Sequence, residues 1–137
     1  MSTASGGSRH LTVRVERSAA EVYAYACDPA HLPEWAAGLA TTLERHGDQW
    51  VVRMPDGEAV LEMGPPNELG VLDHWVTTPD GHRHYNPMRV LALDDGCEVV
   101  FSLRPTPGMT DAELERDAAT VQADLERLRD RVQAPAG

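Results

Sequence analysis

The feature that most constrains this fold is a long run near the C-terminus, from Met109 to Val132, that contains neither proline nor glycine. Its apolar residues recur at steps of three and four, which is typical of one stripe of an α-helix; they are Leu114, Ala118, Val121, Leu125, Leu128 and Val132. Thr110 and Glu113 have the spacing of a capping box, and Pro135 forbids continuation. A helix of twenty-odd residues is about 30 Å long, so it requires a partner surface of similar length.

The preceding residues predict that this partner is a sheet. His10 to Glu16 alternates apolar and polar side chains, as a half-buried strand does. Two short helices should follow, one capped by Ser18 and the other spanning Ala30 to Leu39. Further strands are expected at 41–46, 49–54, 58–63, 69–77, 82–93 and 97–103. Strands joined by such short turns must be antiparallel neighbours.

Composition limits the function classes. The chain has 137 residues and a net charge of −10, so it should repel nucleic-acid phosphate and anionic lipid. The sequence shows no apolar run long enough for a membrane span and no secretory signal, so we expect a cytoplasmic protein. We expect residues 1–8 to be a disordered arm and residues 9–134 to be a single domain. Cys27 and Cys97 lie far apart and are expected to be reduced thiols rather than a disulfide.

Three segments carry a resemblance to a known family: S-A-A-E-V-Y-A-Y-A-C-D-P-A-H-L-P-E-W at 18–35, G-V-L-D-H-W-V at 70–76 and N-P-M-R-V at 86–90. Together with the order of elements, they resemble the START-related superfamily, which includes the birch-pollen-allergen fold and the polyketide cyclase/dehydrase and lipid-transport proteins. The resemblance implies an α+β helix-grip fold, in which a curved antiparallel sheet of about 6–7 strands wraps the long C-terminal helix and leaves a cavity between them. Because the functions of this superfamily range from carrier to cyclase to hydrolase, the fold does not select one.

Turn chemistry predicts which side chains of residues 71–90 face this cavity. Thr-Pro-Asp-Gly-His at 78–82 suits a type I turn followed by a left-handed glycine, which pairs Thr78 with His82 and His74 with Asn86. One face is then apolar apart from three polar residues, and we place it inside; it holds Leu72, His74, Val76, His84, Asn86, Met88 and Val90. A two-residue turn would instead shift the partners by one, and would bring Asp73, Trp75 and Thr77 inside.

A similar turn at 54–58 predicts the next hairpin. Met-Pro-Asp-Gly-Glu would pair Trp50 with Glu62 and Val52 with Val60. Two inward faces remain open, one with Trp50, Val52, Val60 and Glu62 and the other with Val51, Arg53, Leu61 and Met63. Each would place an ionisable residue, Glu62 or Arg53, among apolar neighbours. That residue could also lie near the sheet edge and extend its charge into solvent.

The inward polar residues suggest two kinds of chemistry. His74 or His84 could act as a general acid or base, with Asn86 orienting a substrate carbonyl, as an aldol-type cyclisation or dehydration requires. The same three could also form a satisfied polar patch in the cavity of a carrier. Trp35 lies in the second short helix, which forms part of the cavity rim in the resembling family, and is either a gate or a core aromatic residue. The candidate ligand-binding residues are Trp35, Leu72, Val76, Met88, Val90 and Glu62.

The sequence thus favours binding of a small hydrophobic or aromatic molecule, with no cofactor and no bound metal, since the histidines do not have the spacing of a zinc site. A polyketide cyclase or dehydratase is the first alternative. A protein-interaction module that uses Trp75 and Tyr85 on the outer sheet face is the second. No nucleic-acid partner is expected, and a homodimer is left open.

Overall fold

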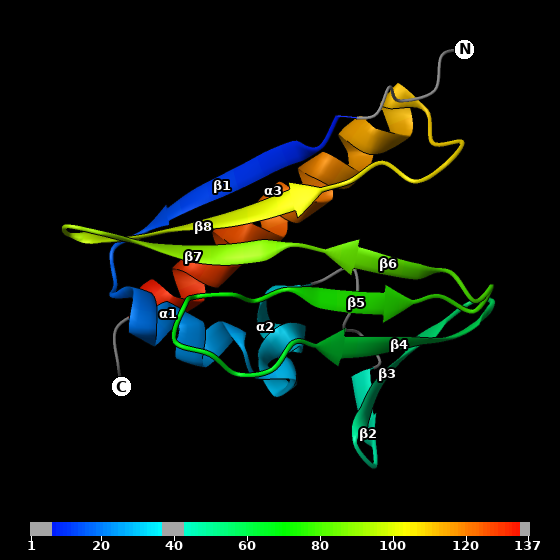
Figure 1. Cartoon of the computed structure of the whole chain (residues 1–137), viewed down its shortest axis with the longest axis horizontal. Coiled ribbons are helices and arrows are strands. Elements are labelled where there is room, and N and C mark those ends of the chain that lie inside the picture. Colours follow the sequence, from blue (N-terminus) through cyan, green and yellow to red (C-terminus); the bar gives the residue numbers. More distant parts are fainter. Residues whose placement is uncertain (1–6, 37–42, 135–137) are drawn as a thin grey trace.

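The structure, a computed structural model, describes residues 7–36 and 43–134. In this part of the chain a first strand and short helices precede the remaining strands and one long helix (Figure 1). The elements are β1 (Arg9–Val15), α1 (Ala19–Ala26), the 3-10 helix η1 (Pro29–His31), α2 (Leu32–Trp35), β2 (Leu43–His46), β3 (Gln49–Met54), β4 (Gly57–Met63), β5 (His74–Thr77), β6 (Arg83–Asn86), β7 (Met88–Leu93), β8 (Gly96–Leu103) and α3 (Asp111–Gln133). No helix within these residues is long and apolar enough to cross a membrane.

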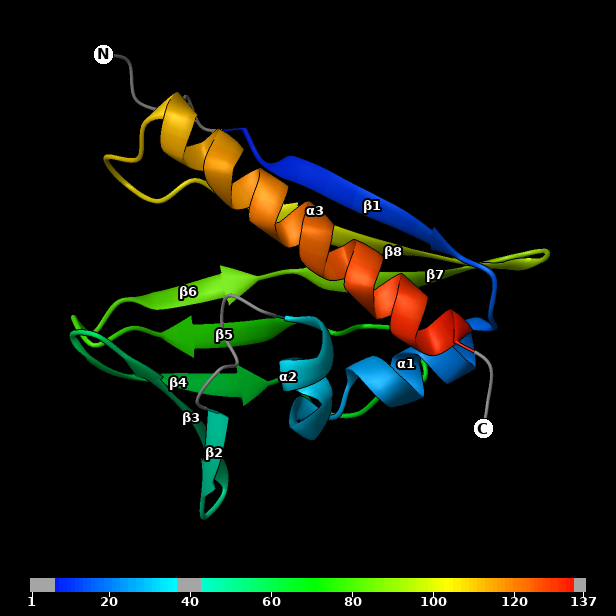
Figure 2. The same cartoon turned by 180° about the vertical axis from the view of Figure 1, so that it is seen from behind.

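The long helix α3 forms as its sequence predicts. The Thr110 hydroxyl accepts a hydrogen bond from the Glu113 backbone N–H at 3.2 Å, and the Glu113 carboxylate accepts one from the Thr110 N–H at 3.0 Å, so the capping box is complete. The apolar stripe faces the sheet, and Leu125 and Leu128 are fully buried. Figure 2 shows α3 lying across the sheet formed by β1, β8 and β7.

The strands form two antiparallel groups that join into one curved surface. The order in the first group is β1-β8-β7, and in the second it is β2-β3-β4-β5-β6. β6 and β7 are separated only by Pro87, which has no N–H to continue the ladder. Hydrogen bonds from the Leu72 N–H to the Met88 carbonyl, at 2.8 Å, and from the Ser102 N–H to the Pro87 carbonyl, at 2.9 Å, hold the two groups together. The fold is therefore an α+β helix grip.

Pro87 also explains why the described residues contain eight strands instead of about 6–7. The predicted strand at 82–93 is divided at this proline into β6 and β7. The predicted strand at 69–77 is shorter, because only His74 to Thr77 is regular. The second short helix was predicted over 30–39; the described part is η1 and α2, and residues 37–39 lie outside the described residues, as do Thr41 and Thr42 of the predicted strand at 41–46.

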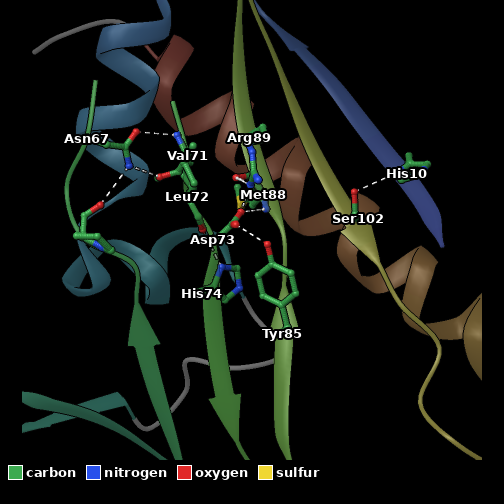
Figure 3. Close-up of polar contacts among 11 residues, drawn as sticks. His10, Asn67, Val71, Leu72, Asp73, His74, Tyr85, Met88, Arg89 and Ser102 are labelled. Atoms are coloured by element: carbon green, nitrogen blue, oxygen red, sulfur yellow. Dashed lines mark hydrogen bonds and ion pairs between the residues drawn. The ribbon is translucent and has the colours of Figure 1, made fainter. Parts of the chain in front are cut away.

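The loop before β5 is held by one asparagine and one glycine. The Asn67 side-chain oxygen accepts hydrogen bonds from the N–H groups of Leu69 and Val71, and its amide nitrogen donates to the Val71 carbonyl at 2.9 Å (Figure 3). Gly70 has a φ of +74°, and a Cβ there would collide with the carbonyl oxygen of Val90. The position therefore requires glycine.

The predicted strand register is correct for one hairpin and wrong for the other. In the β5–β6 hairpin the Thr78 N–H donates to the His82 carbonyl at 2.9 Å and His74 pairs with Asn86, so the predicted register is confirmed and the shifted one is excluded. In the β3–β4 hairpin the predicted register is wrong by one residue: Trp50 pairs with Leu61. The observed register places Val52 opposite Ala59 and Met54 opposite Gly57, so the turn is one residue shorter than predicted.

Candidate functional site

A cavity of about 670 Å³ lies between α3 and the sheet. Residues of α1, α2, α3 and strands β4 to β8 line it, together with the segments that precede β5 and α3. Most of the lining is apolar and includes Trp35, Leu61, Met63, Leu72, Val76, Met88, Phe101, Val121 and Leu125. The polar side chains of the lining are fewer and include His74, His84, Asn86, Arg104, Thr106, Asp117, Thr120 and Asp124.

His74 is the most buried histidine of the sheet wall, with 9% of its surface exposed. Its Nδ1 lies 3.0 Å from the Leu72 carbonyl oxygen (Figure 3). Because a carbonyl can only accept, Nδ1 carries the proton, and Nε2 of the neutral ring holds a lone pair. Burial lowers the pKa of His74 below its usual 6.5, and the Leu72 hydrogen bond offsets only part of this effect. The ring is thus held neutral in one tautomer.

The three predicted catalytic residues all line the cavity, but they do not form one cluster. Asn86 lies directly opposite His74 across the β5–β6 ladder. His84 lies opposite Val76, one inward-facing pair closer to the turn. Its Nε2 is 3.5 Å from the Thr78 hydroxyl, so it belongs to the turn end of the hairpin. On the sheet wall, His74 and Asn86 therefore form a pair, and His84 lies separately, nearer the turn.

Some of the predicted ligand-binding residues line the cavity and others do not. Trp35, Leu72, Val76 and Met88 line the cavity, whereas Val90 is buried in the core and is not part of the lining. Glu62 is a correction: it lies on the outer sheet face, and its carboxylate is 3.4 Å from an Arg83 nitrogen. The register explains this, because Glu62 pairs with Trp75 on the outer face while its neighbours Leu61 and Met63 point inward.

Trp35 is both a core residue and a wall of the cavity, so the two roles proposed for it are not exclusive. It is 7% exposed and packs in the hydrophobic core. Its backbone carbonyl accepts a hydrogen bond from Arg127 Nε at 3.1 Å, which fixes α2 to α3. Its indole Nε1 is buried and has no hydrogen-bond partner among the described residues. A buried donor without a partner within the protein carries a desolvation cost.

The sequence did not reveal the polar residues that α3 contributes. Asp117, Thr120 and Asp124 line the cavity beside the apolar stripe. Asp124 is 9% exposed and forms an ion pair with Arg127, three residues further along the helix. Their spacing by three and four places them along one edge of the buried stripe, but does not by itself show that they point into the cavity.

A second unpredicted feature is the carboxylate of Asp73, which ties β5 to its neighbours from the outer face. It accepts hydrogen bonds from the Tyr85 hydroxyl at 2.5 Å and from the Met88 N–H at 3.0 Å, and it forms an ion pair with Arg89 (Figure 3). These contacts span both sides of the break at Pro87 and thereby fix the β5–β6 pairing that carries His74 and Asn86.

The outer face also carries the aromatic pair considered for protein interaction. The Trp75 and Tyr85 rings stack with centroids 5.4 Å apart, and the Arg83 guanidinium lies 4.8 Å above the Trp75 ring. Tyr85 is 42% exposed. In the described part of the chain, no group of three or more His, Cys, Asp and Glu residues could hold a metal ion, and Cys27 and Cys97 are free thiols.

The fold of this chain is similar to those of several solved structures. No family model and no curated protein matches the sequence. Norcoclaurine synthase from Thalictrum flavum is similar over 99% of this chain and 99% of its own, with a TM-score of 0.67 and 16% identity. This likeness shows that the chain has the helix-grip fold. The allergen Ara h 8.0201 has the same helix-grip fold, with a TM-score of 0.62 and 10% identity over 93% of this chain and 98% of its own. DynU16, from the dynemicin biosynthetic locus, matches 93% of this chain at a TM-score of 0.69 and 16% identity, but this chain spans only 47% of DynU16.

Proposed function

We propose that this protein binds a small hydrophobic or aromatic molecule, in the cytoplasm, in the cavity between the sheet and α3. The cavity itself carries the proposal: its volume of about 670 Å³ falls within the range of roughly 300–1,000 Å³ that small-molecule sites occupy. Its wall is mostly apolar, and it has a small number of polar groups, which is the composition that binds and orients such ligands.

A pair of substitutions on adjacent residues of β5 tests this proposal. Val76 lines the cavity, and Thr77, the next residue, points to the outer face. The folded wild-type protein should bind an anilinonaphthalene sulfonate dye saturably. Val76→Trp should fill part of the cavity and weaken binding, whereas Thr77→Trp adds the same ring outside and should leave it unchanged. Equal dye binding by both variants would place the dye outside the cavity, and no binding by the wild type would mean that the cavity takes up no such molecule. Either result would favour an interaction module on the outer face.

The natural ligand can be sought directly by native mass spectrometry of the purified protein. A co-purified molecule would show as a mass above that of the 15.0 kDa chain. We expect Asn86→Leu to preserve dye binding, because it keeps the wall apolar. The same variant should weaken a ligand that bears a carbonyl or hydroxyl, because it removes the orienting amide.

Acid–base catalysis, as in a polyketide cyclase or dehydratase, is the second candidate, and the state of His74 favours it. The imidazole is neutral and its Nε2 lone pair is free of backbone contacts, so Nε2 is available to a bound substrate as a general base. Asn86, directly opposite, could hold the substrate carbonyl. An enzyme would convert the bound molecule and lose turnover, but not binding, in His74→Ala. A carrier would release the molecule unchanged in both proteins.

A further inference from the structure

Two polar groups lie side by side on the sheet wall of the cavity. Directly paired residues of an antiparallel ladder have Cβ atoms about 4.5–5.5 Å apart, and His74 and Asn86 are such a pair. Within residues 7–36 and 43–134, no other side chain or backbone group bonds Nε2 of His74 or the side-chain amide of Asn86. Both residues line the cavity, so a ligand can reach them.

The chemistry of this pair is restricted because the His74 tautomer is fixed. The Leu72 carbonyl takes the Nδ1 proton at 3.0 Å, so Nε2 can only accept a hydrogen bond. A ligand carbonyl, ether or carboxylate oxygen placed at Nε2 would set two lone pairs against each other. A hydroxyl donates to Nε2 and can at the same time accept from the Asn86 amide, so it satisfies both groups.

The charges around the cavity disfavour an anion at this position. Asp117 and Asp124 line the helix side of the cavity, and the nearby Arg127 is ion-paired with Asp124. Arg104 is the cation of the described lining; it follows β8 and donates to the Ser8 hydroxyl at 3.1 Å. A carboxylate at the His74–Asn86 pair would gain no hydrogen bond from Nε2 and would enter a cavity that already holds Asp117 and Asp124, which is costly.

From these contacts we infer that the His74–Asn86 pair is a subsite for an undissociated hydroxyl group, and that the ligand is a neutral hydroxylated aromatic molecule, a phenol. This rests on the proposed function, because it presupposes that the cavity is a binding site. The aromatic body occupies the apolar wall formed by Trp35, Leu61 and Phe101, and the hydroxyl points to the sheet. Phenols titrate near pH 10, so they remain neutral at cellular pH.

Three fluorescent probes that share one ring system test the inference without any mutation. They are 1-hydroxypyrene, 1-methoxypyrene and pyrene-1-carboxylic acid, each titrated at neutral pH and followed by quenching of tryptophan fluorescence, since Trp35 lines the cavity. One hydrogen bond predicts that 1-hydroxypyrene binds roughly 2- to 10-fold more tightly than 1-methoxypyrene. The carboxylate should bind most weakly of the three.

Substitutions then test whether the preference for the hydroxyl probe comes from the His74–Asn86 pair. In His74→Leu the ratio of the two dissociation constants should fall to about 1, because the acceptor is gone while the apolar wall remains. Asn86→Leu gives a second route to the same loss if the first variant does not fold. His46→Leu is the matched control, because His46 is exposed on β2 and bonds Glu44; it should keep the wild-type ratio.

Each outcome separates this inference from the proposed function. If no pyrene binds, the cavity is not a site and both fail. If the hydroxyl and methoxy probes bind equally, or if the ratio persists in both His74→Leu and Asn86→Leu, the subsite is refuted while the cavity remains a binding site. If the carboxylate binds most tightly, the ligand is an acid and the inference is wrong.

Discussion

Replacing Leu125 by alanine should lower the free energy of unfolding by about 2.5–4 kcal/mol. Leu125 is fully buried in the middle of the α3 stripe. The change removes three carbon groups, and burial of each contributes about 0.8 kcal/mol, which gives about 2.4 kcal/mol before any void is counted. Leucine-to-alanine changes in cores cost about 2–5 kcal/mol in total. We expect a value below the upper end, because Leu125 borders the existing cavity and the new space would join it.

Urea unfolding followed by circular dichroism measures this loss. The matched control is Leu91→Ala, the same change at a residue of β7 that is 47% exposed, and it should cost well under 1 kcal/mol. In a thermal scan, each kcal/mol should correspond to roughly 3–5 °C for a domain of this size. If Leu125→Ala and Leu91→Ala unfold at the same urea concentration, α3 does not pack on the sheet through this stripe and the helix-grip arrangement is refuted.

Three further changes have defined outcomes. Gly70→Ala should destabilise the protein by more than about 1 kcal/mol in urea unfolding, because its φ is positive and the added Cβ would meet the Val90 carbonyl. Burial holds the His74 pKa below the 6.5 of the unfolded chain, so the unfolded state binds the proton first as pH falls; stability should drop between pH 6.5 and the folded pKa by at most about 1.4 kcal/mol per pH unit, and His74→Leu should flatten this slope. Deleting Met1–Ser8 should leave the melting temperature unchanged, because the segment has little apolar surface and the hydrogen bond that Ser8 accepts from Arg104 is exposed; a lower value would show that the segment packs on the domain.

The fold could be predicted where local and global signals agree. The capping box of Thr110 and the apolar stripe of α3 indicate the same helix, and the turn at 78–82 predicts the same inward face as the apolar residues around it. The turn at 54–58 has a similar motif but gave the wrong register. Here Val51 and Val52 are both buried, so neighbouring residues of β3 are apolar on both faces. Sequence alternation therefore could not correct the turn.

The site could be predicted only where the backbone decides the direction of a side chain. Alternation along β5 and β6 placed His74, His84 and Asn86 at the cavity, because strand side chains point to opposite faces in turn. Asp124 lies at the edge of a helical stripe, where spacing alone does not separate an inward side chain from an exposed one. Its ion pair with Arg127 is local to α3, but Arg127 also donates to the Trp35 carbonyl of α2, and this packing is a tertiary property.

The same alternation connects the outer face to the cavity. Asp73 and His74 are adjacent on the chain, so when one side chain points outward the other points inward. Asp73 is bonded to Tyr85, and Tyr85 is the neighbour of Asn86. The outer hydrogen bond between Asp73 and Tyr85 thus spans the same two strands as the inner pair of His74 and Asn86. Because a register slip moves both faces together, we expect a change that shifts the pairing of the outer residues to shift the inner pair as well. The polar cluster on the outside therefore serves to hold the geometry of the cavity wall.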